Sequence, residues 1–297
     1  MSITVSAVQM QEQAVPLPVA IQRICACPGG NDNPSPDNPI FILAAGWRTG
    51  STLLQRLVIS SKQAMIWGEP FGPASIVNFM TEPLRRIPRE LFGERFLDTN
   101  QPIDPAVLST KWIANLYPTL DFLQAAHVNY WQSMLGAPAR KLGFQRWGFK
   151  DVRLSIDHAW YLKWLFPNAR FLFIYRNPFE AYVSYKDFGK LWYHTWPEKP
   201  LTTAEDFGRH WNQLASGFTT RANEVGGMVV CFEELIKDDR VVQQIEQYLQ
   251  MPLDRSVLQQ KVGSQPHNYK VSPSELQGLQ RSTSPTFTRL GYQFPDL

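Results

Sequence analysis

The stretch PIFILAAGWRTGSTLLQRLVI, residues 39–59, decides the fold of this chain. Residues 39–45 form a short, continuous apolar run, which is the pattern of a strand buried on both faces of a sheet. Residues 53–59 place apolar side chains at helical spacing. Between the two runs lie two glycines, an arginine and three small hydroxyl side chains. The stretch therefore predicts a strand, a tight loop and a helix.

A loop of this composition favours an anion as ligand. A glycine-rich loop that opens a helix presents unpaired backbone N–H groups and the positive end of the helix dipole, and both stabilise a bound phosphate. An ordinary strand-to-helix turn remains the alternative for this stretch taken alone.

The composition is that of a globular protein without an extended charged surface. The chain has 297 residues, of which 44% are hydrophobic and 19% charged, so it is long enough for one large α/β domain or two small ones. A net charge of +3 argues against a nucleic-acid partner and leaves room for a local anion pocket. The three cysteines form neither a disulfide framework nor a metal-binding spacing, and we expect no metal. We find no membrane span or secretion signal and expect a cytoplasmic protein.

The order of apolar runs predicts a central parallel sheet flanked by helices. We expect residues 1–38 to be a flexible leader and residues 39–297 to be one domain. Strands are predicted at 39–45, 64–67, 146–151, 170–175 and 228–232, with helices at 155–166, from 177 onward, at 204–225 and at 241–249. Residues 75–140 are interpreted as a helical insertion over the sheet. In such a fold, ligands bind at the carboxyl ends of the strands.

A second informative stretch is FLFIYRNPFEAYVSY, residues 171–185. Arg176 follows a buried strand at its carboxyl end, and Ser184 lies within two turns of the start of the next predicted helix. The guanidinium and the hydroxyl can therefore converge on one phosphate. The alternative is that Arg176 pairs with Glu180 and that Ser184 is a small packing residue.

Together, the two stretches resemble the sulfotransferases that use 3′-phosphoadenosine-5′-phosphosulfate (PAPS). In that family a loop of the form Lys/Arg-Ser/Thr-Gly-Ser/Thr-Ser/Thr holds the 5′-phosphosulfate, and residues 48–52 match it. A later motif that begins Arg-Asn/Asp-Pro and ends in Ser holds the 3′-phosphate, and residues 176–184 match it with the spacing intact. The loop variant is closer to the carbohydrate-type and bacterial branches than to the phenol-type branch. The resemblance extends from about residue 40 to 250 and is sharp at the two loops.

The resemblance implies a P-loop-like sulfotransferase fold, PAPS as co-substrate, adenosine 3′,5′-bisphosphate (PAP) as product, and no metal. It assigns the nucleotide to Arg48, Thr49, Gly50, Ser51, Thr52, Arg176 and Ser184. Transfer of the sulfuryl group is in line, and positive charge from Arg48 stabilises the leaving oxygen. Arg281 is a further candidate for the 3′-phosphate, in a C-terminal stretch that we expect to be polar and flexible.

The general base is sought among residues that follow the second strand. Glu69, within Trp67-Gly68-Glu69-Pro70, is similar to the acidic segment of the carbohydrate-type and tyrosyl-protein branches, where a Glu is the proposed base. Lys150 ends a predicted strand on the same side and is expected to contact the sulfuryl group or the acceptor, with Arg153 as a second choice. The alternatives are a Glu69 that caps a turn or pairs with a lysine, and a Lys150 paired with Asp151. His127 and His194 are held in reserve as bases.

The acceptor is expected to be a small molecule, apolar or cationic, that offers a hydroxyl or alternatively a nitrogen. Six aromatic side chains fall in segments expected to line its pocket, with core packing as the alternative: Phe71, Phe79, Trp131, Trp192, Tyr193 and Trp196. A role in specialised metabolism fits such an acceptor. Two other functions remain open, a nucleotide kinase or NTPase and a non-catalytic nucleotide-binding protein. The spacing of the glycines and the absence of a following lysine argue against the first of these. No oligomeric state is predicted.

Overall fold

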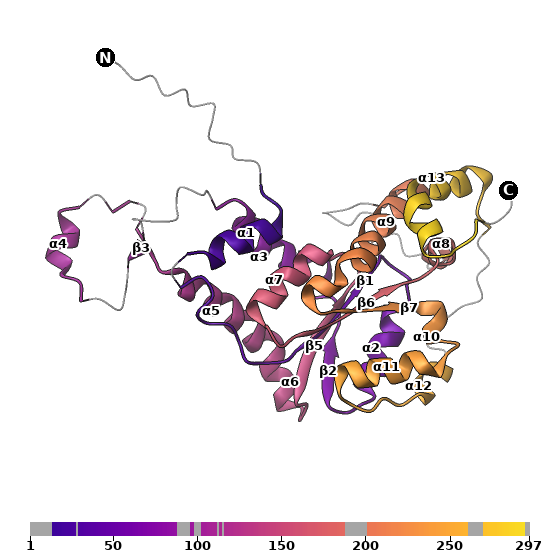
Figure 1. Ribbon diagram of the computed structural model, residues 1–297, viewed down its shortest axis with the longest axis horizontal. Helices are drawn as coiled ribbons and strands as arrows, with labels where there is room; N and C mark the ends of the chain where they lie inside the picture. Colours follow the sequence, from indigo (N-terminus) through magenta and orange to yellow (C-terminus); the bar gives the residue numbers. More distant parts are fainter. Residues whose placement is uncertain are drawn as a thin grey trace, which may run out of the picture.

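The computed structural model describes residues 14–27, 29–87, 96–97, 102–111, 113–114, 116–187, 201–260 and 270–294. Its centre is a five-stranded sheet in the order β2-β5-β1-β6-β7, in which every pair of neighbours is parallel (Figure 1). The strands are β1 Ile40–Ala44, β2 Ala64–Trp67, β5 Arg146–Asp151, β6 Arg170–Tyr175 and β7 Met228–Cys231. A separate two-stranded pair joins β3 Phe96–Leu97 to β4 Tyr117–Pro118. The predicted α/β class and parallel sheet are confirmed.

Helices cover both faces of the sheet. Figure 1 shows α2, α11 and α12 on one face and α7 and α9 on the other. The first half of the chain contains α1 Leu17–Cys25, α2 Ser51–Ile59, α3 Ile76–Arg85, α4 Pro105–Ser109, α5 Leu120–Trp131 and α6 Ala137–Lys141. The second half contains α7 Ile156–Leu165, α8 Pro178–Asp187, α9 Ala204–Arg221, α10 Phe232–Leu235, α11 Asp239–Leu249, α12 Ser256–Gln259 and α13 Pro273–Arg289. In the described ranges no helix is long and apolar enough to cross a membrane.

The middle strand shows why its sequence is apolar without interruption. All five residues of β1 are buried, because β5 and β6 flank it and helices cover both faces. Phe41 packs against Phe149 of β5, with ring centroids 4.9 Å apart, and against Phe171 of β6 at 5.5 Å. Leu43 of β1 lies opposite Asp151. The carboxyl ends of these three strands therefore lie at one edge of the sheet.

Two helices lie where flexible chain was expected. The leader interpretation is wrong for α1, whose apolar residues recur at helical spacing and pack against α7 and α3. The C-terminal stretch is also not a flexible tail, because α13 packs along α9 and buries Leu279 and Phe287. The sequence of α13 is rich in Ser, Thr and Gln, so its narrow stripe of buried residues was not recognised as a helical pattern.

The helical insertion is confirmed. Its described part contains α3, α4, α5 and α6, with a π-helical turn over Gln132–Gly136 and the short β3–β4 pair. The start of α8 is also as predicted, since the side-chain oxygen of Asn177 accepts the N–H of Phe179 at 2.9 Å. Pro178 occupies the first helical position, where a missing N–H costs nothing.

Candidate active site

The loop between β1 and α2 is forced into its shape by glycine. Gly46, Arg48 and Gly50 all have left-handed backbones, with φ of 87°, 63° and 85°. A Cβ at Gly50 would lie 2.1 Å from the ring of Phe232, so only glycine fits against this ring. Gly50 is the N-cap of α2, and the first N–H groups of a helix have no intrahelical acceptor. The loop can therefore offer backbone donors to an anion.

The two motifs meet at the carboxyl edge of the sheet. The Nε of Arg48 donates to the Oγ of Ser184 at 2.9 Å, across 136 residues of sequence. The Nη1 of Arg176 donates to the backbone oxygen of Arg48 at 3.3 Å. The structure thus brings Arg48, Arg176 and Ser184 into one cluster, which two adjacent anion sites would require.

Arg176 has the surroundings of an anion-binding side chain. Its guanidinium lies 4.7 Å from the centre of the Phe232 ring, and it also pairs with Glu180 at 3.4 Å, as the packing alternative expected. Within the described ranges, its Nε is buried without a hydrogen-bond partner. Burial lowers the pKa of Arg176, because the charged guanidinium is partly removed from water. An anion beside it would satisfy the buried donor.

The loop hydroxyls are placed differently from one another. Thr49 is fully buried and its Oγ1 donates to the backbone oxygen of Gly46 at 3.1 Å, so this hydroxyl stabilises the loop itself. Ser51 is also buried, whereas Thr52 is exposed. Thr49 can contact a ligand in the loop through its backbone, while the Thr52 hydroxyl is accessible.

Glu69 and Lys150 form an ion pair. The Nζ of Lys150 lies 2.6 Å from the Oε1 of Glu69, and the two side chains are only 13% and 17% exposed. Glu69 therefore pairs with a lysine, as one of its two alternatives expected. The alternative for Lys150, a pair with Asp151, is not found, because its Nζ bonds Glu69 instead. Lys150 lies opposite Ile42 in β1, so the pair stands at the same edge of the sheet as the loop between β1 and α2. The carboxylate is held where it could accept a proton, with a cation beside it.

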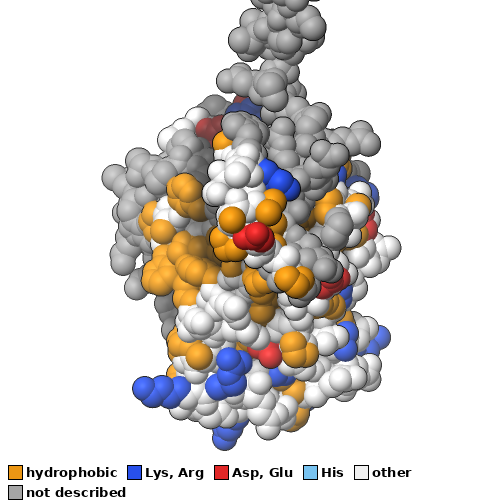
Figure 2. Space-filling model, turned by 90° about the vertical axis from the view of Figure 1, so that its left-hand side faces the viewer, with side chains coloured by type: hydrophobic (Ala, Val, Ile, Leu, Met, Phe, Trp, Pro, Cys, Tyr) orange, Lys and Arg blue, Asp and Glu red, His pale blue; other side chains and the backbone are white. Residues whose placement is uncertain are grey.

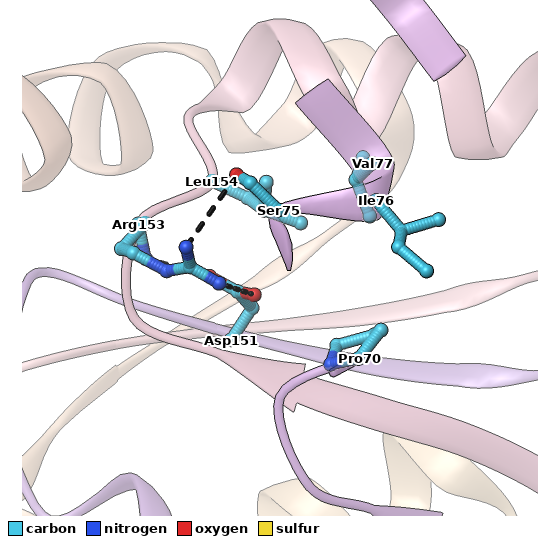
Figure 3. Close-up of a pocket in the computed structure, with 7 residues that line it drawn as sticks. All are labelled: Pro70, Ser75, Ile76, Val77, Asp151, Arg153 and Leu154. Atoms are coloured by element: carbon cyan, nitrogen blue, oxygen red, sulfur yellow. Dashed lines mark hydrogen bonds and ion pairs between the residues drawn. The ribbon is translucent and has the colours of Figure 1, made fainter. Parts of the chain in front are cut away.

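Arg153 holds the turn that follows Glu69, which was not expected. Its Nη2 donates to the backbone oxygen of Gly72 at 3.0 Å. Its Nη1 donates to the Oγ of Ser75 at 3.4 Å, as Figure 3 shows. Phe71 and Ser75, on either side of this turn, have left-handed backbones with φ of 52° and 48°. Such strain persists only where surrounding contacts impose it, and Arg153 supplies two of them.

Asp151 completes this support. It is 1% exposed, and its two carboxylate oxygens accept the backbone N–H of Arg153 at 2.7 Å and the Nη2 of Arg153 at 3.3 Å. Burial raises the pKa of Asp151 to about 6, against the opposing charge of Arg153. Asp151, Arg153, Pro70 and Ser75 surround a small hollow (Figure 3). The hollow has no room for a water molecule, so these side chains pack closely and leave no space for a ligand.

The remaining candidates are divided between core and surface. Trp131 was expected to line the acceptor pocket, which is wrong: it is fully buried and packs against Phe149 at 5.5 Å. His127 lies 2.8 Å from the hydroxyl of Tyr161, and burial lowers its pKa to about 4, which makes it a neutral structural residue near pH 7. Trp192, Tyr193, Trp196 and His194 lie outside the described residues.

Two predicted aromatic residues are on the surface. Phe71 is 66% exposed and Phe79 is 71% exposed. Figure 2, which views the molecule from the left of Figure 1, shows hydrophobic side chains gathered on that face. Phe71 follows Glu69 by two residues, so one exposed aromatic side chain lies close in sequence to the candidate base.

Two further residues support the site, one beside the loop between β1 and α2 and one beside Arg176, and neither had a sequence signal of function. His210 of α9 packs on Trp47 with ring centroids 5.3 Å apart, and its Nε2 lies 3.1 Å from the backbone oxygen of Val152. Glu233 of α10 accepts the backbone N–H of Asn177 at 2.8 Å and so ties α10 to the Arg176 segment. Both act through the fold, and no spacing in the sequence connects them to the loop.

Comparisons with known proteins find similar solved structures and one matching family model. Solved structures similar to this chain include three sulfotransferases. One is a sulfotransferase domain from the curacin biosynthetic pathway, with 16% identity, 87% of this chain and 99% of that chain covered, and a TM-score of 0.49. The sulfotransferase domain of the Synechococcus PCC 7002 olefin synthase has 18% identity, 89% and 98% coverage and a TM-score of 0.46. Sulfotransferase STF9 from Mycobacterium avium has 17% identity, 94% and 82% coverage and a TM-score of 0.42.

A search of curated proteins gives no match. The sequence model described as "Sulfotransferase family" matches residues 39–255, which is more than half of the chain and includes residues 48–52 and 176–184 together with Glu69 and Lys150. On this match, the chain belongs to the sulfotransferase family.

Proposed function

We propose that the protein transfers a sulfuryl group from PAPS to a hydroxyl, or alternatively a nitrogen, of a small-molecule acceptor. The observation that carries the proposal is the contact of Arg48 with Ser184 and of Arg176 with the Arg48 backbone. Each motif offers donors for one phosphate, so their contact suits a nucleotide with phosphates at both its 3′ and 5′ positions. A kinase is not favoured, because the family match is to sulfotransferases.

In this scheme the donors are divided between the two phosphates of the nucleotide. The guanidinium of Arg48 and the N–H groups that open α2 hold the 5′-phosphosulfate. Arg176, with its buried Nε, and Ser184 hold the 3′-phosphate. Ser184 can accept from Arg48 and still donate its own proton to a phosphate oxygen, because a hydroxyl is both acceptor and donor.

The reaction forms one bond and breaks one bond at sulfur. The acceptor oxygen attacks in line, the bond from sulfur to the bridging phosphate oxygen breaks, and PAP leaves with that electron pair. Glu69 accepts the acceptor proton. Lys150, 2.6 Å from Glu69, orients the carboxylate and places positive charge near the transferred group. The scheme assigns no step to a metal.

Calorimetric titration tests the nucleotide assignment. We expect PAP to bind without a metal and more tightly than ATP, with or without Mg²⁺. Arg176→Ala should weaken PAP binding by about tenfold or more and adenosine 5′-phosphate binding far less, since only PAP carries the 3′-phosphate. Arg240→Ala, a change at an exposed arginine of α11, is the control. Equal weakening for both nucleotides would refute the 3′-phosphate role, and tighter binding of Mg²⁺-ATP would refute the donor.

Glu69→Gln separates catalysis from binding alone. With labelled PAPS and a panel of apolar hydroxyl and amine acceptors, the variant should lose about a hundredfold or more in turnover while PAP affinity stays within about twofold. Full activity of the variant would exclude Glu69 as the base. If the wild-type protein binds PAP and labels no acceptor in the panel, a non-catalytic nucleotide-binding function is the better description.

A further inference from the structure

A second pocket lies at the opposite edge of the sheet, where β5 and β6 begin. Its volume is about 310 Å³. Side chains that line it include Asn38, Arg146, Lys163, Asn168, Arg170 and Gln250. Arg146 and Arg170 are the first residues of β5 and β6, and Lys163 comes from α7. We call these three cations and the space between them the basic pocket.

The basic pocket has no acidic counterpart. No Asp or Glu lines it, and among the ion pairs of the described ranges none involves Arg146, Lys163 or Arg170. Arginines elsewhere in the molecule are commonly paired, as Arg221 is with Glu224 and Asp157. The basic pocket therefore differs from the rest of the molecule, because its three cations have no carboxylate among the described residues to balance their charge.

Neutral groups hold the two guanidinium groups in place. The Nε and Nη1 of Arg146 donate to the backbone oxygens of Asn38 at 2.9 Å and Leu249 at 2.8 Å. The guanidinium of Arg170 lies 5.2 Å from the centre of the Tyr248 ring. These contacts fix the direction of the side chains and leave their charge uncompensated. A site whose donors are already oriented loses little conformational entropy when a ligand binds.

The charges also disfavour one another. Burial, and then the charge of Arg170, lower the pKa of Arg146 to about 10 and lower the pKa of Lys163. A bound anion would relieve both effects, because an opposite charge stabilises the ionised form of each group. Charge-assisted hydrogen bonds to phosphate or sulfate oxygens are the contacts that arginine and lysine make best.

We propose that the basic pocket binds a tetrahedral oxyanion, a phosphate or sulfate group, at a site separate from the one that holds the nucleotide. The two sites lie at opposite ends of the same strands, roughly 16 Å apart along the five residues of β1. The inference does not depend on the proposed sulfuryl transfer, because it rests on residues that take no part in it.

Titration calorimetry with inorganic phosphate tests the site. The full chain is titrated at constant ionic strength, with chloride as the balancing anion, so that general screening is held fixed. Lys163→Gln should weaken phosphate binding about tenfold, because one charge-assisted donor is lost. Lys163 has no side-chain hydrogen bond or ion pair among the described contacts, so this change will not disturb the fold. Lys237→Gln, at an exposed lysine after α10, makes the same change in net charge and should leave binding within about twofold.

Arg48→Ala separates this site from the phosphate loop. Phosphate binding that is sensitive to Lys163→Gln should persist in the Arg48→Ala protein. The proposal is overturned if Lys163→Gln binds phosphate as the wild type does, or if all binding disappears with Arg48→Ala. Arg170→Gln provides a second, independent variant and should also weaken binding. Ribose 5-phosphate is titrated beside inorganic phosphate: tighter binding of the sugar phosphate identifies a phosphorylated small molecule as the ligand class, and tighter binding of inorganic phosphate identifies the free ion.

Discussion

Replacing Gly50 with alanine should lower both the stability of the protein and its affinity for PAP. Gly50 has a φ of 85° and caps α2. A Cβ at this position would lie 2.1 Å and 2.4 Å from two ring carbons of Phe232, much closer than van der Waals contact allows. The Phe232 ring also lies against the guanidinium of Arg176 at 4.7 Å. Any shift of the ring that admits the methyl group therefore displaces Arg176.

Two separate costs set the size of the effect. A non-glycine residue in the left-handed region costs about 1–2 kcal/mol. Forcing a methyl group into packed surroundings costs about 1–3 kcal/mol more. Gly50→Ala should therefore lower the free energy of unfolding by about 2–5 kcal/mol. Displacement of Arg176 should weaken PAP binding in addition, since charge-assisted hydrogen bonds depend strongly on geometry.

Gly143→Ala is the matched control. Gly143 has a similar φ of 89°, but a Cβ there meets nothing within 4 Å, so only the backbone cost applies. Urea-induced unfolding of the two variants measures the difference directly. The reasoning is refuted if Gly50→Ala loses no more stability than Gly143→Ala, or if its PAP affinity equals that of the wild type.

Three further predictions concern groups around the site. Burial raises the pKa of Asp151 from 3.8 to about 6, so the stability it contributes as a protonated acid is lost as pH rises through 6. Relative to Asp151→Asn, the wild type should lose roughly 3 kcal/mol between about pH 4 and pH 7, measured by urea unfolding. Arg153→Lys should lower kcat several-fold and leave PAP affinity unchanged, because a lysine cannot bond both Gly72 and Ser75 as the guanidinium does. Burial lowers the pKa of His127 to about 4, so His127→Gln should leave the pH–rate profile unchanged above about pH 5.5.

The sheet was predictable because a strand that is buried on both faces appears in the sequence as a short, continuous apolar run. β2 and β6 have the predicted bounds, 64–67 and 170–175. The four middle residues of β6 are buried and apolar, as expected of a strand that is covered on both faces. The helix α1 was missed for the opposite reason. Its apolar stripe is short, and these side chains are buried only because α7 lies beside them. That contact is part of the tertiary structure and leaves no pattern within residues 17–25.

The sequence predicted which loops form the candidate site, but it did not predict every contact between their side chains. Each motif identified its residues locally, and Arg48, Arg176 and Ser184 do come together. The pairing of Glu69 with Lys150 could not be read from sequence. It depends on the register of β2 against β5, in which Trp67 lies opposite Phe149, so that Glu69, two residues beyond β2, lies close to Lys150, the residue after Phe149.

The same strand order produces the basic pocket. Because β1 lies between β5 and β6, Arg170 stands two strand spacings, roughly 10 Å, from Gly148, and Arg146 lies two residues before Gly148 in β5. At the other ends of these strands, Lys150 and Arg176 flank the phosphate loop in the same way. The two edges differ in what lies between the cations. At the carboxyl edge Glu69 and Glu180 balance part of the charge, whereas none of the described residues that line the pocket at the amino edge carries a carboxylate. On electrostatic grounds, the amino edge therefore also favours a bound oxyanion.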